Sequence, residues 1–155
     1  LGTRRAGDAF ALRRAAGLVA SELRRAHAAA VAENADHTVE FVLGSPGALA
    51  VYRAKLATEN CPSGMAPVSS TLCRRLIAAG EWPGSVGIES ANTTFPSCAA
   101  PADPANKCVV FKPLGYAETS SSCSSSPCQV QLRSRSGVGA AIAVALPTGR
   151  VSVLP

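Results

Sequence analysis

The first part of the chain carries apolar residues at the spacing of one helix face. They recur at steps of four and three residues, at Leu12, Ala16, Val19, Leu23, Ala26 and Ala30. This spacing places all six on one stripe of an α-helix. The opposite face carries four arginines, with Glu22 and Glu33 between them; the arginines are Arg13, Arg14, Arg24 and Arg25. Only Gly17 lowers the helix propensity, by about 1 kcal/mol relative to Ala. The pattern predicts a helix over 8–35, about 40 Å long at a rise of 1.5 Å per residue.

Beyond residue 36, apolar and polar positions alternate with the period of β-strands. Runs of this kind lie at 37–43, 49–56, 108–112, 130–133, 142–146 and 151–153. The turn sequence Ser45-Pro46-Gly47 separates the first two runs and predicts a hairpin. The signal is weaker over 60–104, with short candidate elements at 72–79 and 86–89. We therefore expect an α+β fold in which a long N-terminal helix packs on antiparallel β-sheet.

The length of the chain and the placement of its prolines describe a single domain. The chain has 155 residues, and all 11 prolines lie at Pro46 or beyond. One core of this size buries about 70% of the surface of the unfolded chain. We expect one domain over 1–155, with a helical spine over 1–36 and a β-rich head over 37–155. The serine-rich segment 119–127 is expected to be one of several cysteine-bearing loops in the head.

The cysteines indicate a compartment. Zinc sites usually need C-x₂₋₄-C pairs, and this chain has no CxxC, so disulfides are favoured over zinc and over free thiols. Disulfides require an oxidising compartment, which is periplasmic or extracellular. Six cysteines allow many pairings. We favour sequence neighbours, because they would order segments with few hydrophobic residues; the pairs are Cys61 with Cys73, Cys98 with Cys108, and Cys123 with Cys128.

Composition and motifs narrow the functional classes. A net charge of +5 permits an anionic partner without requiring one. The longest apolar run, 140–147, is far shorter than the roughly 20 residues of a membrane helix. No GxSxG, P-loop or HExxH pattern occurs, and the carboxylates are scattered along the chain. Paired cysteines would leave no thiol for nucleophilic catalysis beside His27 or His37. We predict no enzyme activity, no metal and no cofactor.

Three segments together resemble the GspH/FimT group of minor pseudopilins, which are type IV pilin-like proteins. The helix over 18–34 and its step into the strand at 39–41 resemble that group's Leu-x₄-Leu-x-x-Ala-Arg-x-x-Ala, with Arg25-Ala26 in place of Ala-Arg. The segment Phe111-Lys112-Pro113-Leu114-Gly115 is similar to the group's Phe-x-Pro-x-Gly. The C-terminal run from 130 to Gly149-Arg150-Val151 is similar to the group's ending, in which a strand precedes Gly-Arg and a last short strand. The cysteine-rich stretch 60–108 has no counterpart in this comparison.

The resemblance implies a role in filament assembly. Such proteins begin with a prepilin leader and a hydrophobic helix, which anchors them in the bacterial inner membrane, facing the periplasm, until assembly; Leu1 would follow that segment. We expect a minor pilin or pseudopilin, a structural component of a type IV pilus or of a type II secretion pseudopilus. Its partners would be other subunits, and it would contact the membrane only through the N-terminal segment absent from this sequence.

The same resemblance assigns a role to the helical stripe. The residues Leu12, Ala16, Val19, Leu23, Ala26 and Ala30 would pack against neighbouring subunits. A pilin-like helix longer than its head should leave its first turns, with Phe10 and Leu12, apolar and without a partner. The alternative is an unrelated secreted, disulfide-containing binding domain, which would bury the whole stripe in its own sheet.

A further alternative is DNA binding during DNA uptake, which some members of the FimT branch perform. Their ending reads Gly-Arg-x-Arg, whereas this chain has Gly149-Arg150-Val151-Ser152 and keeps only the first arginine. Arg133 and Arg135 are two apart on one predicted strand and would point the same way. Arg150 follows a turn that would bring it beside them, in a region without Asp or Glu. The competing interpretation of these arginines is a solvated strand face.

Overall fold

A computed structural model describes residues 2–55, 58–77 and 80–154 of the chain. One long helix, α1 (Gly2–Glu33), opens it and is followed by strands only. These are β1 (His37–Val42), β2 (Ala48–Ala54), β3 (Ala66–Ser69), β4 (Leu72–Ile77), β5 (Val86–Glu89), β6 (Lys107–Phe111), β7 (Ala117–Glu118), β8 (Cys128–Ser134), β9 (Gly139–Ala145) and β10 (Arg150–Leu154).

The strands form two antiparallel sheets. The first has the order β3-β4-β2-β1-β6-β7, and the second has the order β10-β9-β8-β5. The predicted hairpin of the first two strands is present, with Val39 opposite Val51. An isolated bridge between Gly44 and Ile88 joins the two sheets next to that turn. The predicted α+β class, with a long N-terminal helix packed on antiparallel sheet, is confirmed.

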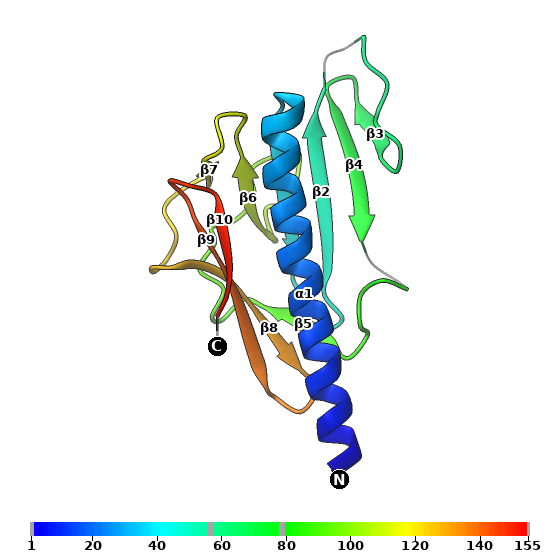
Figure 1. Ribbon diagram of the computed structural model, residues 1–155, viewed down its shortest axis with the longest axis vertical. Coiled ribbons are helices and arrows are strands. Elements are labelled where there is room, and N and C mark those ends of the chain that lie inside the picture. The colour runs from blue at the N-terminus through cyan, green and yellow to red at the C-terminus, as the bar shows by residue number, and fades with distance from the viewer. Residues whose placement is uncertain (1, 56–57, 78–79, 155) are drawn as a thin grey trace.

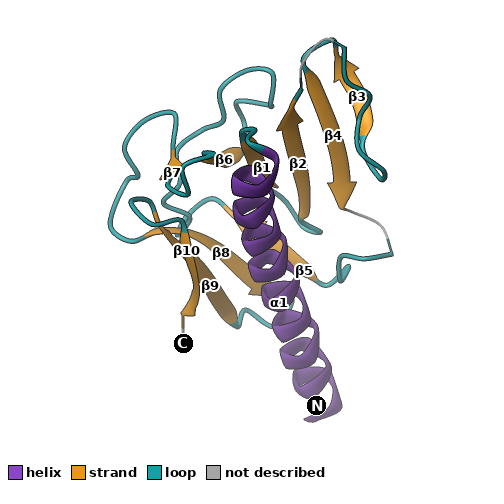
Figure 2. Ribbon diagram, turned by 45° about the horizontal axis from the view of Figure 1, so that its top comes forward, coloured by secondary structure: helices purple, strands orange, loops and turns teal. Residues whose placement is uncertain are grey.

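The helix packs on both sheets and shares one core with them. In Figures 1 and 2, α1 lies across strands of both sheets, and no strand covers its opposite side. The core joins Leu23 of α1 to Phe41 of β1 and Phe111 of β6 in the first sheet, and to Leu132 of β8 and Ile142 of β9 in the second. All five side chains are fully buried. The chain therefore closes its core by placing α1 over the junction of the two sheets.

The boundaries differ from the sequence pattern in three places. The helix begins at Gly2, six residues before the predicted start, and it ends at Glu33 because Asn34 adopts a left-handed φ of 50°. Strands β3 and β7 were not predicted. All four side chains of β3 are exposed, and β7 has only two residues, so neither has an apolar alternation to detect. The predicted element at 72–79 forms β4 up to Ile77, and its last two residues lie outside the described part.

The three disulfides join the predicted sequence neighbours. Cys61 pairs with Cys73, Cys98 with Cys108, and Cys123 with Cys128. Each bond ties a loop to a strand, because Cys73 lies in β4, Cys108 in β6 and Cys128 in β8. No cysteine of the described residues is free. The pairing indicates an oxidising, extracytoplasmic compartment.

Candidate functional site

The apolar stripe of α1 packs inside the chain's own core. The six residues predicted to pack against other subunits have exposed fractions of at most 5%: Leu12, Ala16, Val19, Leu23, Ala26 and Ala30. They face the two sheets. The prediction that this stripe contacts neighbouring subunits is therefore corrected, because no partner can reach it in this fold. Burial of the whole stripe is the outcome expected for the alternative, an unrelated secreted domain. Any surface that α1 offers to another molecule lies on its opposite side.

The first turns of α1 lie outside the core. The core begins at Leu12, with Ala11 packed partly against it, whereas Phe10 is 64% exposed. Figure 1 shows the N-terminal end of α1 extending beyond the strands. The expectation of unpartnered first turns therefore holds for Phe10 and is wrong for Leu12, which the sheets already cover.

The side of α1 that faces away from the sheets forms a continuous exposed face. We call this the outer face; its residues are Phe10, Arg13, Arg14, Gly17, Ser21, Arg24, Arg25, Ala28 and Val31. At about 100° per residue, Gly17, Ser21 and Ala28 continue the line of Phe10. Arginines lie on both sides of that line. The outer face is thus a narrow line of mostly small residues between two rows of positive charge.

The structure separates the three arginines that were expected to form a DNA-binding face. Arg133 in β8 lies opposite Gly139 at one end of β9, whereas Arg150 in β10 lies opposite Ala145 at the other end. At about 3.4 Å per residue, the two positions are about 20 Å apart along β9. Arg135 lies just beyond the end of β8. The expectation that Arg150 joins Arg133 and Arg135 is wrong, because β9 lies between β8 and β10.

Arg133 is also neutralised by a carboxylate. Its Nε and Nη2 donate to the two carboxylate oxygens of Glu89, at 2.6 and 2.8 Å, and its Nη1 donates to the carbonyl of Gly137 at 2.7 Å. These hydrogen bonds from Arg133 lower the pKa of Glu89 below its usual value. The bidentate pair joins β5 to β8 and stabilises the second sheet. The charge of Arg133 is therefore already paired with that of Glu89.

Ion pairs line the flank of the helix that lies beside the first sheet. Glu22 of α1 accepts a short hydrogen bond from Arg75 of β4. Glu33, at the helix end, pairs with the ring of His37 at 2.9 Å and with Nε of Arg53 at 3.3 Å. These contacts join α1 to the first sheet. Both glutamates of α1 are therefore paired with residues of the same chain.

His27 joins the loop at 111–115 to the turn at 149–150. Its Nε2 lies 2.7 Å from the carbonyl oxygen of Gly115, and its ring packs against Phe111 with centroids 5.5 Å apart. Gly149 also lies against the ring, because a Cβ at this residue would be 2.6 Å from Nε2 of His27. The sequence placed His27 at the edge of the stripe but did not reveal this junction, because its three parts are far apart in the chain.

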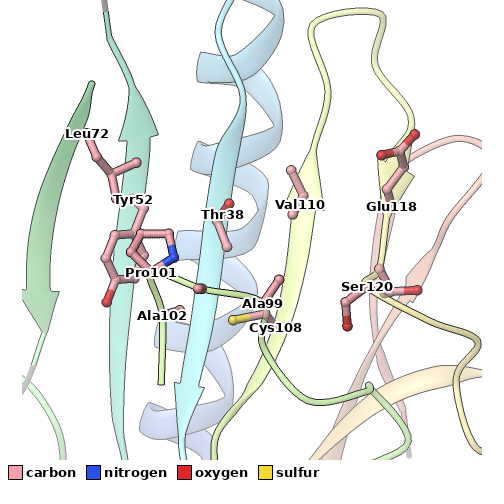
Figure 3. Close-up of a pocket in the computed structure, with 12 residues that line it drawn as sticks. Thr38, Tyr52, Leu72, Ala99, Pro101, Ala102, Cys108, Val110, Glu118 and Ser120 are labelled. Carbon is pink, nitrogen blue, oxygen red and sulfur yellow. The ribbon is translucent and has the colours of Figure 1, made fainter. Parts of the chain in front are cut away.

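A pocket lies on the face of the first sheet that points away from α1. It has a volume of about 220 Å³ and is lined by residues of five strands, of the loop 99–102 and of the segment 119–120. Figure 3 shows Thr38 and Tyr52 on neighbouring strands, with Leu72 and Glu118 at opposite sides. Most of the lining is apolar. Its volume is below the roughly 300 Å³ of typical small-molecule sites, so the pocket suits a single small apolar group.

A buried carboxylate supports this pocket. Glu40 of β1 accepts hydrogen bonds from the Tyr52 hydroxyl at 2.9 Å and from the side-chain amide of Asn106 at 2.8 Å. It also accepts from the backbone N–H of Asp103, at 3.2 Å. Burial, followed by the hydrogen bond to Glu40, raises the pKa of Tyr52. Glu40 therefore anchors the loop closed by Cys98–Cys108, and its oxygens are occupied.

Neither metal ligation nor a membrane span is found in the described part of the chain. Among residues 2–55, 58–77 and 80–154, no group of three His, Cys, Asp or Glu side chains is placed to hold a metal ion. No helix within these ranges has the length and apolar character needed to cross a membrane. Comparison of the chain with protein-family models, curated proteins and solved structures gives no match.

Proposed function

We propose that this chain is a structural subunit of a pilin-like filament, a minor component of a type IV pilus or of a type II secretion pseudopilus. The observation that carries the proposal is the relation of α1 to its head. The helix spans 32 residues, but among the residues from 6 onward, whose side chains are described, its core contacts begin at Ala11 and Leu12. The first turns carry Phe10, which is 64% exposed, and extend beyond the sheets. Such an extension is suited to packing among the helices of neighbouring subunits.

The pilin-like segments contact one another in space, which supports the same proposal. The segment at 111–115 and the Gly149-Arg150 turn both meet α1 at His27. Three separate parts of the chain that resemble one family therefore form one junction. The disulfides support the extracytoplasmic location that such a filament requires.

The residues encoded before Leu1 test the proposed role directly. We expect a Gly-Phe-Thr-Leu-x-Glu start followed by a hydrophobic helix, which is the prepilin pattern. A cleavable secretory signal peptide would contradict the proposal and favour an unrelated secreted binding domain.

A second test uses cross-linking in the producing cell. We expect Phe10→Cys in the full gene product to cross-link to other subunits in sheared filaments. The control is Val68→Cys, which places a thiol at a 47% exposed apolar position on the edge strand β3. Equal cross-linking of the two variants would argue against packing through the first turns of α1.

DNA binding at the predicted arginines is not a second proposed function. Arg133 is paired with Glu89, and Arg150 lies at the other end of β9. No observation brings together the charges on which that alternative depended.

A further inference from the structure

The outer face of α1 carries positive charge that the chain does not neutralise. Within the described residues, no carboxylate lies within 4.0 Å of the guanidinium groups of four of its arginines; these are Arg13, Arg14, Arg24 and Arg25. Arg24 donates to the backbone carbonyl of Val151 at 3.4 Å, which positions its charge without neutralising it. Glu22 and Glu33 lie on the flank next to Arg25, but Glu22 is paired with Arg75, and Glu33 with His37 and Arg53.

The four arginines are regularly arranged. Arg13 and Arg14 precede Arg24 and Arg25 by 11 residues, which is three helical turns and about 16 Å. Arg13 and Arg24 lie on one side of the central line, and Arg14 and Arg25 lie on the other. Gly17, on the line between the two pairs, is open to solvent, because a Cβ there would meet nothing within 4 Å.

This arrangement discriminates between possible occupants. In the described residues α1 is the single helix, so a helix from a second copy would meet this one outer face to outer face, with arginines against arginines. Like charges brought together across an interface are strongly unfavourable. A nucleic acid would be attracted to the charge but would gain nothing from the small residues between the rows. A helix with small residues facing it can approach to about 8 Å between axes. The facing helix could then place carboxylates beside both rows.

We propose that the outer face of α1 docks a helix of a different, acidic subunit. That helix would carry pairs of carboxylates 11 residues apart, so that both arginine pairs are met at once. The inference rests on the proposed filament role, which supplies helical neighbours. It adds that packing through this face is heterotypic, because the charge opposes self-association.

The preference of the outer face for an acidic helix can be tested with a probe made from the chain itself. In this probe the four outer-face arginines are changed: Arg13→Glu, Arg14→Glu, Arg24→Glu and Arg25→Glu. The probe and the otherwise wild-type chain each also carry Gly17→Cys as a reporter. They are mixed in equal amounts and joined by a short bis-maleimide, and the dimers are counted by intact mass. Random collision gives about two heterodimers for each kind of homodimer.

We expect about a tenfold excess of heterodimer over either homodimer at low salt. The excess should fall towards the random ratio at about 0.5 M salt, because exposed charges are then screened. Restoring one arginine in the probe should weaken the association about two- to fivefold, the range measured for single surface ion pairs. Far-ultraviolet circular dichroism checks that the probe keeps its helix.

A control variant has the same net charge as the probe but an unaltered outer face. It combines Gly17→Cys with four reversals elsewhere: Arg74→Glu, Lys107→Glu, Arg135→Glu and Arg150→Glu. A random dimer ratio with the probe, or an equal excess with the control, would overturn the proposal. Because this readout does not depend on residues before Leu1, its failure is distinguishable from failure of the filament role.

Titration with a DNA duplex tests whether a nucleic acid occupies the outer face instead. At physiological salt, we expect the wild-type chain to bind the duplex no more tightly than about 10⁻⁵ M, as for non-specific association. Tighter binding that is lost in the acidic probe would identify a nucleic acid as the occupant and would overturn the proposal.

Discussion

His27 shows what a single side chain contributes at the residue scale. It extends from α1 into a space bounded by the ring of Phe111 and the backbones of Gly115 and Gly149. Its contacts leave no room for a side chain at residue 149, where a Cβ would lie 2.6 Å from Nε2 of His27 and 2.7 Å from the carbonyl oxygen of Gly115. Residue 149 is therefore a glycine for two reasons. Its φ is positive, and His27 of α1 leaves no space for a Cβ.

Gly149→Ala should therefore be more destabilising than an alanine at a comparable open turn. Gly137 is the control, because its φ of 89° is also positive and a Cβ there would meet nothing within 4 Å. We expect Gly137→Ala to cost about 1 kcal/mol from backbone strain. Gly149→Ala should cost about 3 kcal/mol, because overpacking adds to that strain. Urea unfolding measures both, and equal losses would show that the His27 junction tolerates a side chain.

The Glu89–Arg133 pair should make the stability of the fold depend on pH. Arg133 lowers the pKa of folded Glu89 below the usual 4.5. Its contribution is therefore fully present above pH 4.5 and is lost as the pH falls through the lower folded-state pKa. Glu89→Gln should reduce the fall in the free energy of unfolding over this acidic range. Parallel unfolding curves for the variant and the wild type between about pH 5 and pH 2 would contradict this assignment.

At the scale of elements, the disulfides hold segments that lack apolar periodicity. The bonds Cys61–Cys73, Cys98–Cys108 and Cys123–Cys128 span separations of 12, 10 and 5 residues. In the chain-entropy model, replacing both cysteines by alanine costs about 3 kcal/mol for each of the first two and about 2 kcal/mol for the third. Denaturant unfolding of the three double variants measures this order. A larger loss for the shortest loop would point to native contacts in place of chain entropy.

The first turns of α1 should exchange their amide hydrogens quickly. Among residues 6–10, whose side chains the structure describes, none belongs to the core, so opening of this part of the helix breaks few tertiary contacts. Hydrogen exchange should be fast before Leu12 and slow from Val19 to Val31, where the helix covers both sheets. Equal protection along α1 would mean that its start has a partner within the same chain.

At the scale of the whole molecule, α1 should make the two sheets unfold together. Leu23 is fully buried in the core that both sheets share. Leu23→Ala should therefore lower the stability of both by about 3 kcal/mol. Val31→Ala, at a 52% exposed position of the same helix, should change stability by less than about 0.5 kcal/mol.

The chain contains reporters for this measurement. Trp82 donates its ring N–H to the carbonyl of Val86 in β5, so its fluorescence follows the second sheet. Amide exchange at Val39 and Val51 follows the first sheet. Two separate transitions, or a Leu23→Ala effect on only one sheet, would contradict a single core.

The sequence by itself determined the local elements of this protein. A stripe at helical spacing marked α1, and alternation marked β1, β2, β6 and the C-terminal strands, because these signals come from residues close together in the chain. The disulfides were predictable for the same reason, since each pair closes a short loop. The exposed β3 and the two-residue β7 gave no such signal, because their pairing comes from neighbouring strands.

Only the tertiary structure decided which surfaces remain available. The sequence showed an apolar stripe on α1 but not what covers it, and the two sheets bury that stripe and leave the arginine-rich face open. It showed three C-terminal arginines but not the strand order that separates Arg133 from Arg150. The physical reason is common to both outcomes. Side-chain spacing is fixed by the backbone within one element, whereas the arrangement of elements follows from burial of apolar surface across the whole chain.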